Sequence, residues 1–126
     1  LTDRGRVYLQ YGPPNFVRDE KNFVSNRYMG HGDLADPVTA NTINRSTSLG
    51  QILYLPYQLW RYNNLPGDDI NRCFIFWDEQ RSGHYLLLNS NAKGEVQDPG
   101  WERRLCQQQL PDDVQGDVGD QFQRGY

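Results

Sequence analysis

Two short segments, Cys73–Trp77 and Tyr85–Leu88, constrain the fold of this chain more than any other feature. Both are built of aromatic and aliphatic residues, and a polar run, residues 78–84, separates them. This pattern predicts an antiparallel hairpin with a longer loop. Because successive side chains of a strand point to opposite faces, both faces of the hairpin are apolar. We therefore expect the hairpin, at about residues 72–90, to be central in a sheet and covered on both sides.

Two further elements are expected next to the hairpin. Residues 56–62, Pro-Tyr-Gln-Leu-Trp-Arg-Tyr, predict an aromatic strand that begins at a proline, where no ladder donor is needed. Asp98 is placed to cap a helix at about residues 98–109, on which Trp101 and Leu105 share a face. The predicted fold class is therefore α+β: a small antiparallel sheet of three or four strands, a C-terminal helix and a long irregular insertion.

The first residues fit two readings. Apolar and polar residues alternate over residues 7–11, which favours a strand. Alternatively, Thr2 caps a short helix that stops at Gly12, with Pro13 just beyond it. Gly5 weakens a helix by about 1 kcal/mol relative to Ala. We predict the strand and keep the helix as the alternative.

The remaining segments are polar. Residues 18–55 contain many Asn, Gly and Ser residues, and we predict that they form an irregular insertion within one domain, residues 1–110. Residues 111–126 are rich in Asp, Gln and Gly and predict a polar, flexible tail. The alternative is that the large side chains of Phe122 and Tyr126 dock this tail onto the body or onto a neighbour.

Composition excludes some function classes. The net charge of −3 and the scattered arginines argue against nucleic-acid binding, which needs a basic patch. No apolar run approaches the roughly 18 residues of a membrane helix. His31 and His84 stand apart in the sequence, so neither a metal site nor a cofactor is expected.

Cys73 and Cys106 are the two cysteines of the chain. They allow one disulfide in an exported protein, and the alternative is two buried free thiols. A third reading, a cysteine nucleophile with His84 as base, is disfavoured because a buried thiol has a raised pKa and reacts poorly. The turn carboxylates at residues 68–69 and 78–79 are read as solvated turns rather than as an acid pair.

Aromatic residues are the one surplus, since Phe, Trp and Tyr make up 13% of the chain. Tyr and Trp combine apolar area with a polar group, which suits protein interfaces and sugar-stacking surfaces. The candidate binding residues are Tyr57, Trp60, Tyr62 and Tyr85.

The opening string, Leu-Thr-Asp-Arg-Gly-Arg-Val-Tyr-Leu-Gln-Tyr-Gly-Pro-Pro, resembles the GWxTD-domain family, with Leu1-Thr2-Asp3 matching the end of the name-giving motif. Residues 57–62, 74–76 and 83–87 resemble the aromatic strand and the terminal hairpin of that family. The resemblance implies an exported or lipid-anchored protein of the bacterial envelope, of the Bacteroidetes type, in the periplasm or at the outer membrane, with no settled activity. The residues expected to have structural roles are Asp3, Arg4, Gly5, Gly12, Pro13 and Trp101.

Three functions follow as hypotheses. The first is a non-enzymatic interaction or structural domain that binds an envelope protein partner through aromatic surface. The alternative is a carbohydrate-binding module that stacks Tyr and Trp rings on a glycan. An enzyme that uses Cys106, His84 or the turn carboxylates is the third.

Overall fold

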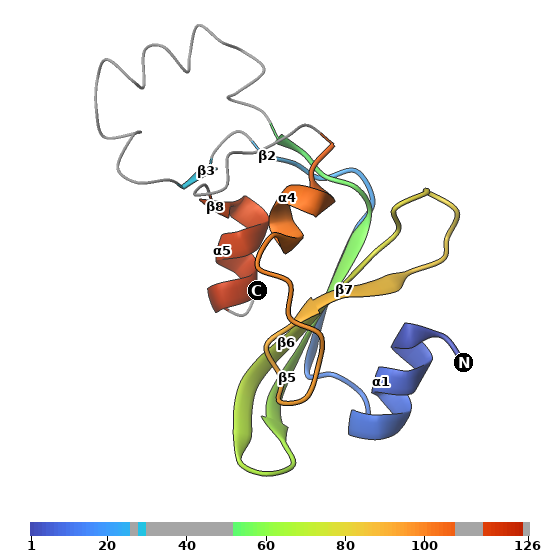
Figure 1. The fold of residues 1–126 in the computed structure, drawn as a ribbon, viewed down its shortest axis with the longest axis vertical. Helices are drawn as coiled ribbons and strands as arrows, with labels where there is room; N and C mark the ends of the chain where they lie inside the picture. The colour runs from blue at the N-terminus through green and yellow to red at the C-terminus, as the bar shows by residue number, and fades with distance from the viewer. Residues whose placement is uncertain (26–27, 30–51, 108–114, 125–126) are drawn as a thin grey trace, which may run out of the picture.

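The structure, a computed structural model, describes residues 1–25, 28–29, 52–107 and 115–124 (Figure 1). Its elements in chain order are α1 (Asp3–Tyr11), β1 (Phe16–Glu20), β2 (Val24–Ser25), β3 (Tyr28–Met29), β4 (Ile52–Leu53), β5 (Tyr57–Leu65), β6 (Asp69–Trp77), β7 (Leu86–Ser90), α4 (Trp101–Leu105), β8 (Gln115–Gly116) and α5 (Asp117–Arg124). The main sheet is antiparallel in the order β1-β5-β6-β7, while β2 pairs with β4 and β3 with β8. This arrangement confirms the predicted α+β class.

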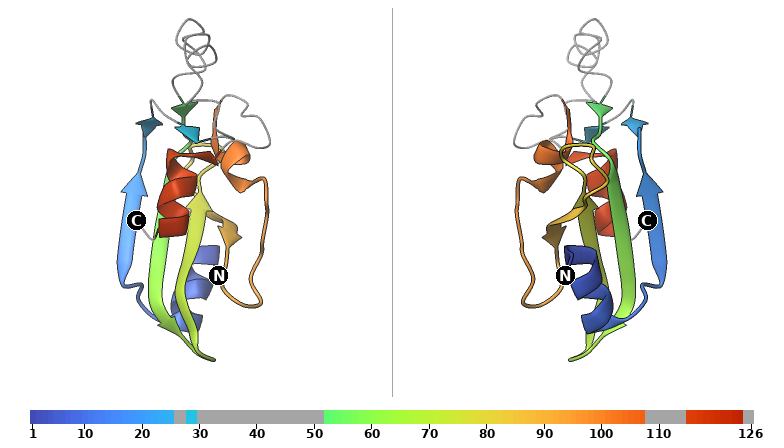
Figure 2. Two further views of the ribbon diagram at one scale, coloured as in Figure 1. Left: turned by 90° about the vertical axis from the view of Figure 1, so that its left-hand side faces the viewer. Right: turned by 90° about the vertical axis from the view of Figure 1, so that its right-hand side faces the viewer.

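Helices cover both faces of the main sheet. α1 lies on one face, and α4 and α5 lie on the other (Figure 2). Along β6, Phe74 packs in the core cluster that contains Val7 of α1, and the next residue, Ile75, packs in the cluster that contains Val118 of α5. Each such buried side chain stabilises the fold by about 1.5–3 kcal/mol relative to exposure. The hairpin is therefore apolar on both faces because a layer of helix covers each face.

The predicted hairpin is formed by β6 and β7, whose pairing shifts register between Ile75 and Phe76. β6 lies inside the sheet, but β7 is its last strand, so only one strand of the hairpin has sheet neighbours on both sides. β5 fills the other side of β6 over almost its whole length, from Tyr57↔Trp77 to Leu65↔Asp69. The aromatic strand and the hairpin therefore form one continuous meander.

The first segment is a helix, so the predicted strand is wrong and the alternative holds. Thr2 is the N-cap, and its Oγ1 accepts a hydrogen bond from Gly5 N at 3.0 Å. The helix ends where Gly12 takes a positive φ of 84° and its N–H donates to Tyr8 O at 2.8 Å. Glycine reaches this left-handed conformation without steric cost, which is the physical basis of the stop.

The predicted insertion, residues 18–55, is too wide at both ends. Residues 18–20 belong to β1, which pairs with β5 at the edge of the main sheet. β2 pairs with β4, and Tyr54 beyond β4 is buried in the core. Charged side chains are common on edge strands because they discourage pairing with a further strand. The charged sequence of β1 therefore resembles that of a polar loop. Residues 26–27 and 30–51 lie outside the described residues.

The predicted helix over residues 98–109 is shorter in the structure. Gly100, and not Asp98, is its N-cap; Asp98 lies two residues earlier, and its Oδ1 accepts from Gly100 N at 3.0 Å. After Leu105 the chain pairs with the segment around β4, through Leu55 N to Leu105 O at 2.9 Å and Gln107 N to Leu53 O at 2.7 Å. These main-chain hydrogen bonds replace the next helical turn. Residues 108–109 are outside the described part.

The predicted polar tail contains a docked helix. Val118 and Phe122 of α5, four residues apart, are buried in the cluster that also holds Leu59 and Ile75 of the sheet. Residues spaced by four share one helix face, and this face supplies the apolar contact. The flexible reading is therefore wrong for residues 115–124, which belong to the same domain as the sheet.

Candidate functional site

The four aromatic residues proposed for binding are all buried. Tyr57 Oη donates to Gln121 Oε1 at 3.0 Å, and Tyr62 Oη donates to Gly12 O at 2.8 Å. Trp60 Nε1 donates to Gln58 Oε1 at 3.1 Å. Their polar atoms are satisfied within the domain, as buried polar groups require. The burial of Tyr57, Trp60, Tyr62 and Tyr85 contradicts an exposed aromatic platform at these positions.

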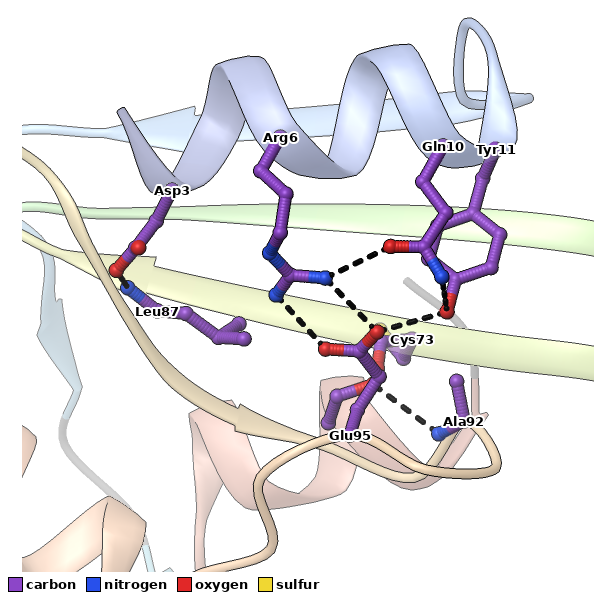
Figure 3. Close-up of polar contacts among 9 residues, drawn as sticks. Asp3, Arg6, Gln10, Tyr11, Cys73, Leu87, Ala92 and Glu95 are labelled. Carbon is purple, nitrogen blue, oxygen red and sulfur yellow. Dashed lines mark hydrogen bonds and ion pairs between the residues drawn. The ribbon is translucent and has the colours of Figure 1, made fainter. Parts of the chain in front are cut away.

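The charged start of the chain forms a set of contacts that we call the α1 clasp, made by Asp3, Arg4, Arg6 and Tyr11 with Tyr85, Leu87 and Glu95. Figure 3 shows the contacts of Asp3, Arg6 and Tyr11. Its centre is a two-bond pair between Arg6 and Glu95, with Nη1 to Oε2 at 3.0 Å and Nη2 to Oε1 at 2.8 Å. Tyr11 Oη donates to the same Oε2 at 2.7 Å. The Glu95 carboxylate therefore accepts three hydrogen bonds from one helix.

The other end of the clasp fixes the start of α1. Asp3 Oδ2 accepts from Leu87 N of β7 at 2.8 Å, and the Arg4 guanidinium lies 4.5 Å from the centre of the Tyr85 ring. Lys21, just after β1, donates to Tyr85 Oη at 3.0 Å. The ring of Tyr85 is thus held by cationic groups from two segments, a favourable arrangement for an aromatic face and a phenol oxygen.

The loop that carries Glu95 is itself anchored to the sheet. Ser90 Oγ donates to Cys73 O at 2.9 Å and accepts from Ala92 N at 3.1 Å (Figure 3). Asp69 Oδ2 accepts from Lys93 N at 3.0 Å in the same loop. Because the loop is fixed, the Glu95 carboxylate has a defined position. The Arg6 guanidinium can therefore pair with it through two hydrogen bonds and hold α1 in place.

The electrostatics of the clasp follow from these contacts. The hydrogen bonds from Arg6 lower the pKa of Glu95, and the hydrogen bond with Glu95 raises the pKa of Arg6. Burial, and then the hydrogen bond to Glu95, raises the pKa of Tyr11 to about 12. All three groups therefore keep their ordinary charge states at neutral pH, which suits a structural contact rather than proton transfer.

Several residues assigned structural roles lie in or near the clasp. A Cβ at Gly5 would lie 3.0 Å from Thr2 Oγ1, so glycine leaves room for the N-cap. Gly12 ends α1, and Pro13 follows it outside the helix. Trp101 lies away from the clasp, at the start of α4, with its ring 5.0 Å from that of Phe122.

A second polar centre, which the sequence analysis did not anticipate, surrounds Glu102 of α4. This buried carboxylate accepts from Tyr54 Oη at 2.7 Å, from Gly116 N at 2.8 Å and from Gly119 N at 2.9 Å. Burial raises the pKa of Glu102 despite these donors, and burial also raises the pKa of Tyr54. The arrangement ties three segments together. In sequence, Glu102 is one of three adjacent charged residues, so nothing local marks it as buried.

The outward side of α1 carries exposed apolar residues, Tyr8 and Leu9, which we call the α1 surface; they are exposed by 50% and 74%. The sequence analysis did not indicate this surface because it predicted a strand for this segment. Helical periodicity would have indicated it.

The two thiols and Asp78, which were considered for catalysis, are buried. Cys73 and Cys106 are free and buried, and burial raises the pKa of each thiol to about 12. Asp69 and Asp78 are exposed by only 2% and 4%, so the reading of these two carboxylates as solvated is wrong. Asp78 accepts from Ser82 N at 2.9 Å and from Gly83 N at 2.7 Å within its own turn. Within the described ranges, no group of three or more His, Cys, Asp or Glu residues could hold a metal ion. His31 lies outside them.

The fold and these contacts define a small α+β domain that is pinned by the α1 clasp and by the buried Glu102, and that presents the α1 surface. No protein family, no curated protein and no solved structure matches this chain, so the resemblance to the GWxTD-domain family stays a prediction.

In the part of the chain that the structure describes, no helix is both long and apolar enough to span a membrane.

Proposed function

We propose that this chain is a non-enzymatic interaction domain of an exported bacterial envelope protein, and that it binds a protein partner through the α1 surface. The envelope setting rests on the family resemblance. The binding role is supported by one observation: Tyr8 and Leu9 are exposed on a helix that charged contacts of Asp3 and Arg6 hold against the rest of the domain.

The fixed position of α1 is what separates this surface from scattered exposed apolar residues, which are normal on soluble domains. A binding surface that is ordered beforehand loses less conformational entropy on association. Leu9 and Tyr8 therefore present apolar area on a backbone that is already ordered, which lowers the entropic cost of binding. A partner with a complementary apolar groove would bury this area, as amphipathic helices do in helix-binding grooves.

The carbohydrate-binding alternative required exposed rings at Tyr57, Trp60, Tyr62 and Tyr85. Those rings are buried, so these four residues support neither a glycan-stacking surface nor a protein-binding one.

Site-specific photocrosslinking in bacteria that produce the full protein tests the proposal. A photoreactive residue at position 9 is expected to give one defined protein adduct, whereas residues at positions 70 and 96 are expected to give none. Ile70 and Val96 are matched controls because they are apolar and exposed by 55% and 58%, but lie outside α1.

The same partner, once isolated, should bind the Leu9→Asp variant at least tenfold more weakly, a loss typical of a central apolar contact. Ile70→Asp should bind like the unchanged protein. Equal adducts from all three positions, or unchanged affinity for Leu9→Asp, would remove the α1 surface from the proposal.

A further inference from the structure

The α1 surface borders a partly buried cation, Arg4, whose guanidinium lies 4.5 Å from the centre of the Tyr85 ring. Arg4 and Tyr8 are four residues apart on α1, a spacing that places two side chains on one helix face. Tyr8 is the exposed ring of the α1 surface. Apolar area and positive charge therefore lie next to each other on this helix.

Arg4 has no carboxylate partner among the described residues, and none of them accepts a hydrogen bond from its guanidinium. Neighbouring cations differ in this respect, since Arg6 pairs with Glu95 and Lys21 pairs with Asp19. The first turn of a helix also disfavours a cation, because the helix dipole is positive there. Helix stability therefore does not account for the charge at this position.

The ring of Tyr85 orients the Arg4 guanidinium without occupying its donors. A ring face attracts the charge but offers no oxygen acceptor, so the five N–H donors of the group stay available. The Oη of the same ring accepts from Lys21 Nζ at 3.0 Å. An oriented guanidinium with free donors is suited to bind a carboxylate through two parallel hydrogen bonds.

We propose that the partner of the α1 surface is a protein segment that carries an Asp or Glu next to its apolar contact residues, and that Arg4 selects this acid. The inference rests on the proposed function, because it names the chemistry of the partner at the same surface. The carboxylate pairs with Arg4 while the apolar side chains cover Tyr8 and Leu9. Complementary charge gives specificity here, since a segment with Lys or Arg at that point would meet an uncompensated cation.

Selection from a random peptide library displayed on phage, with the full protein as target, tests the inference. The unchanged protein should enrich peptides that have Asp or Glu beside large apolar residues. Arg4→Gln should lose the acidic preference and keep the apolar one. Arg104→Gln is the matched control and should enrich the same acidic peptides, because it removes the same charge from α4, on the opposite face of the sheet (Figure 2).

The affinity of one selected acidic peptide gives the quantitative readout. Arg4→Gln should weaken its binding about tenfold, and so should replacement of the peptide's acid by its amide. The two changes together should cost little more than either alone, because both remove the same pair. A purely structural role of Arg4 predicts additive losses instead. Additive losses, or unchanged affinity for Arg4→Gln, would overturn the inference.

Arg4→Lys keeps the test valid if Arg4→Gln folds poorly, because it retains the charge. This variant should bind the acidic peptide more tightly than the amide peptide, and equal affinities would overturn the inference. The proposed function is tested separately by Leu9→Asp. Peptides that this variant binds weakly, but that show no acidic preference, would overturn the acidic partner and leave the α1 surface as the binding site. Peptides that Leu9→Asp binds unchanged would overturn both.

Discussion

Arg6 and Glu95 form two parallel hydrogen bonds across 89 residues of sequence, and they are the main polar link between α1 and the rest of the domain. The Glu95 side chain is 6% exposed and that of Arg6 is 38% exposed, so the pair is only partly screened by solvent. A pair of this geometry is stronger than an ordinary surface ion pair, because both partners are oriented.

Arg6→Ala should therefore lower the free energy of unfolding by about 1–2 kcal/mol, because it removes two of the three hydrogen bonds that the nearly buried Glu95 carboxylate accepts from α1. Urea unfolding measures the change. Arg104→Ala is the matched control, since Arg104 pairs with Asp98 at 2.7 Å but its side chain is 58% exposed. An equal loss in both variants would show that the clasp adds nothing beyond a surface ion pair.

Stability should fall in acid because the pKa values of Glu95, Asp69 and Asp78 are lowered in the folded protein. As the pH falls, such a carboxylate is protonated in the unfolded chain before it is protonated in the folded protein. Its contribution to stability is therefore complete above its pKa in the unfolded chain, and is lost as the pH falls through its pKa in the folded protein. Glu102 acts in the opposite sense: its raised pKa gives a contribution present below the unfolded value and lost as pH rises.

Glu95→Gln isolates one of these contributions. The variant should be less stable than the unchanged protein at pH 6, and the difference should shrink as the pH falls below the ordinary glutamate pKa of about 4.3 and Glu95 becomes protonated in the reference protein. Urea unfolding at several pH values measures it. Glu79→Gln, at an exposed position in the 78–84 loop, is the control for the loss of one carboxylate charge. A constant difference between Glu95→Gln and the unchanged protein would contradict the assignment.

Gly116→Ala should destabilise the domain by about 1–3 kcal/mol, the usual cost of adding a methyl group where there is no room. The methyl group would overlap Tyr54 Oη and Glu102 Oε2, whose positions are fixed by hydrogen bonds. Gly100→Ala is the control, since a Cβ there would approach Arg103 Nη2 at 3.2 Å, the movable end of a long side chain. Thermal unfolding of both variants checks the difference.

The sheet could be predicted because the apolar sequence of its strands by itself indicates that they are buried. Residues 73–77 are apolar at every position, and this pattern requires cover on both faces whatever supplies it. The covering helices were harder. Alternation over residues 7–11 fits a strand, and helix α1 is selected by the Thr2 cap, by Gly12 and by contacts with Leu87 and Glu95, which lie 84 and 89 residues away from their partners.

Polar buried groups were the least predictable part of the domain. Glu102 looks like a solvated helix residue, because its burial depends on α5 arriving from a later segment. The charged residues of β1 look like a loop, because an edge strand tolerates them. Tyr57 and Tyr62 were predicted to make contacts through their rings and hydroxyl groups. The sequence could not show whether the residues that they contact belong to a partner protein or to this domain.

Trp60→Ala should destabilise the domain by about 3–5 kcal/mol, as expected for truncation of a buried aromatic residue. Its ring packs 4.9 Å from Phe76, centre to centre, in the cluster under α1. Leu9→Ala, at an exposed position, should change stability by no more than about 0.5 kcal/mol. Urea unfolding of both variants checks this, and any loss of binding in Trp60→Ala should follow the unfolded fraction. Similar stability changes in the two variants would contradict the assigned burial.

Alkylation of the two cysteines should be slow in the folded protein and complete after unfolding. Burial raises the pKa of Cys73 and Cys106 to about 12, so the reactive thiolate is scarce at neutral pH and shielded from reagent. Native protein should therefore react at least ~100-fold more slowly than the chain unfolded in guanidinium without reductant. Mass spectrometry should then find two alkyl groups on the unfolded chain. No addition without reductant, with two after reduction, would instead establish the disulfide that the sequence allows.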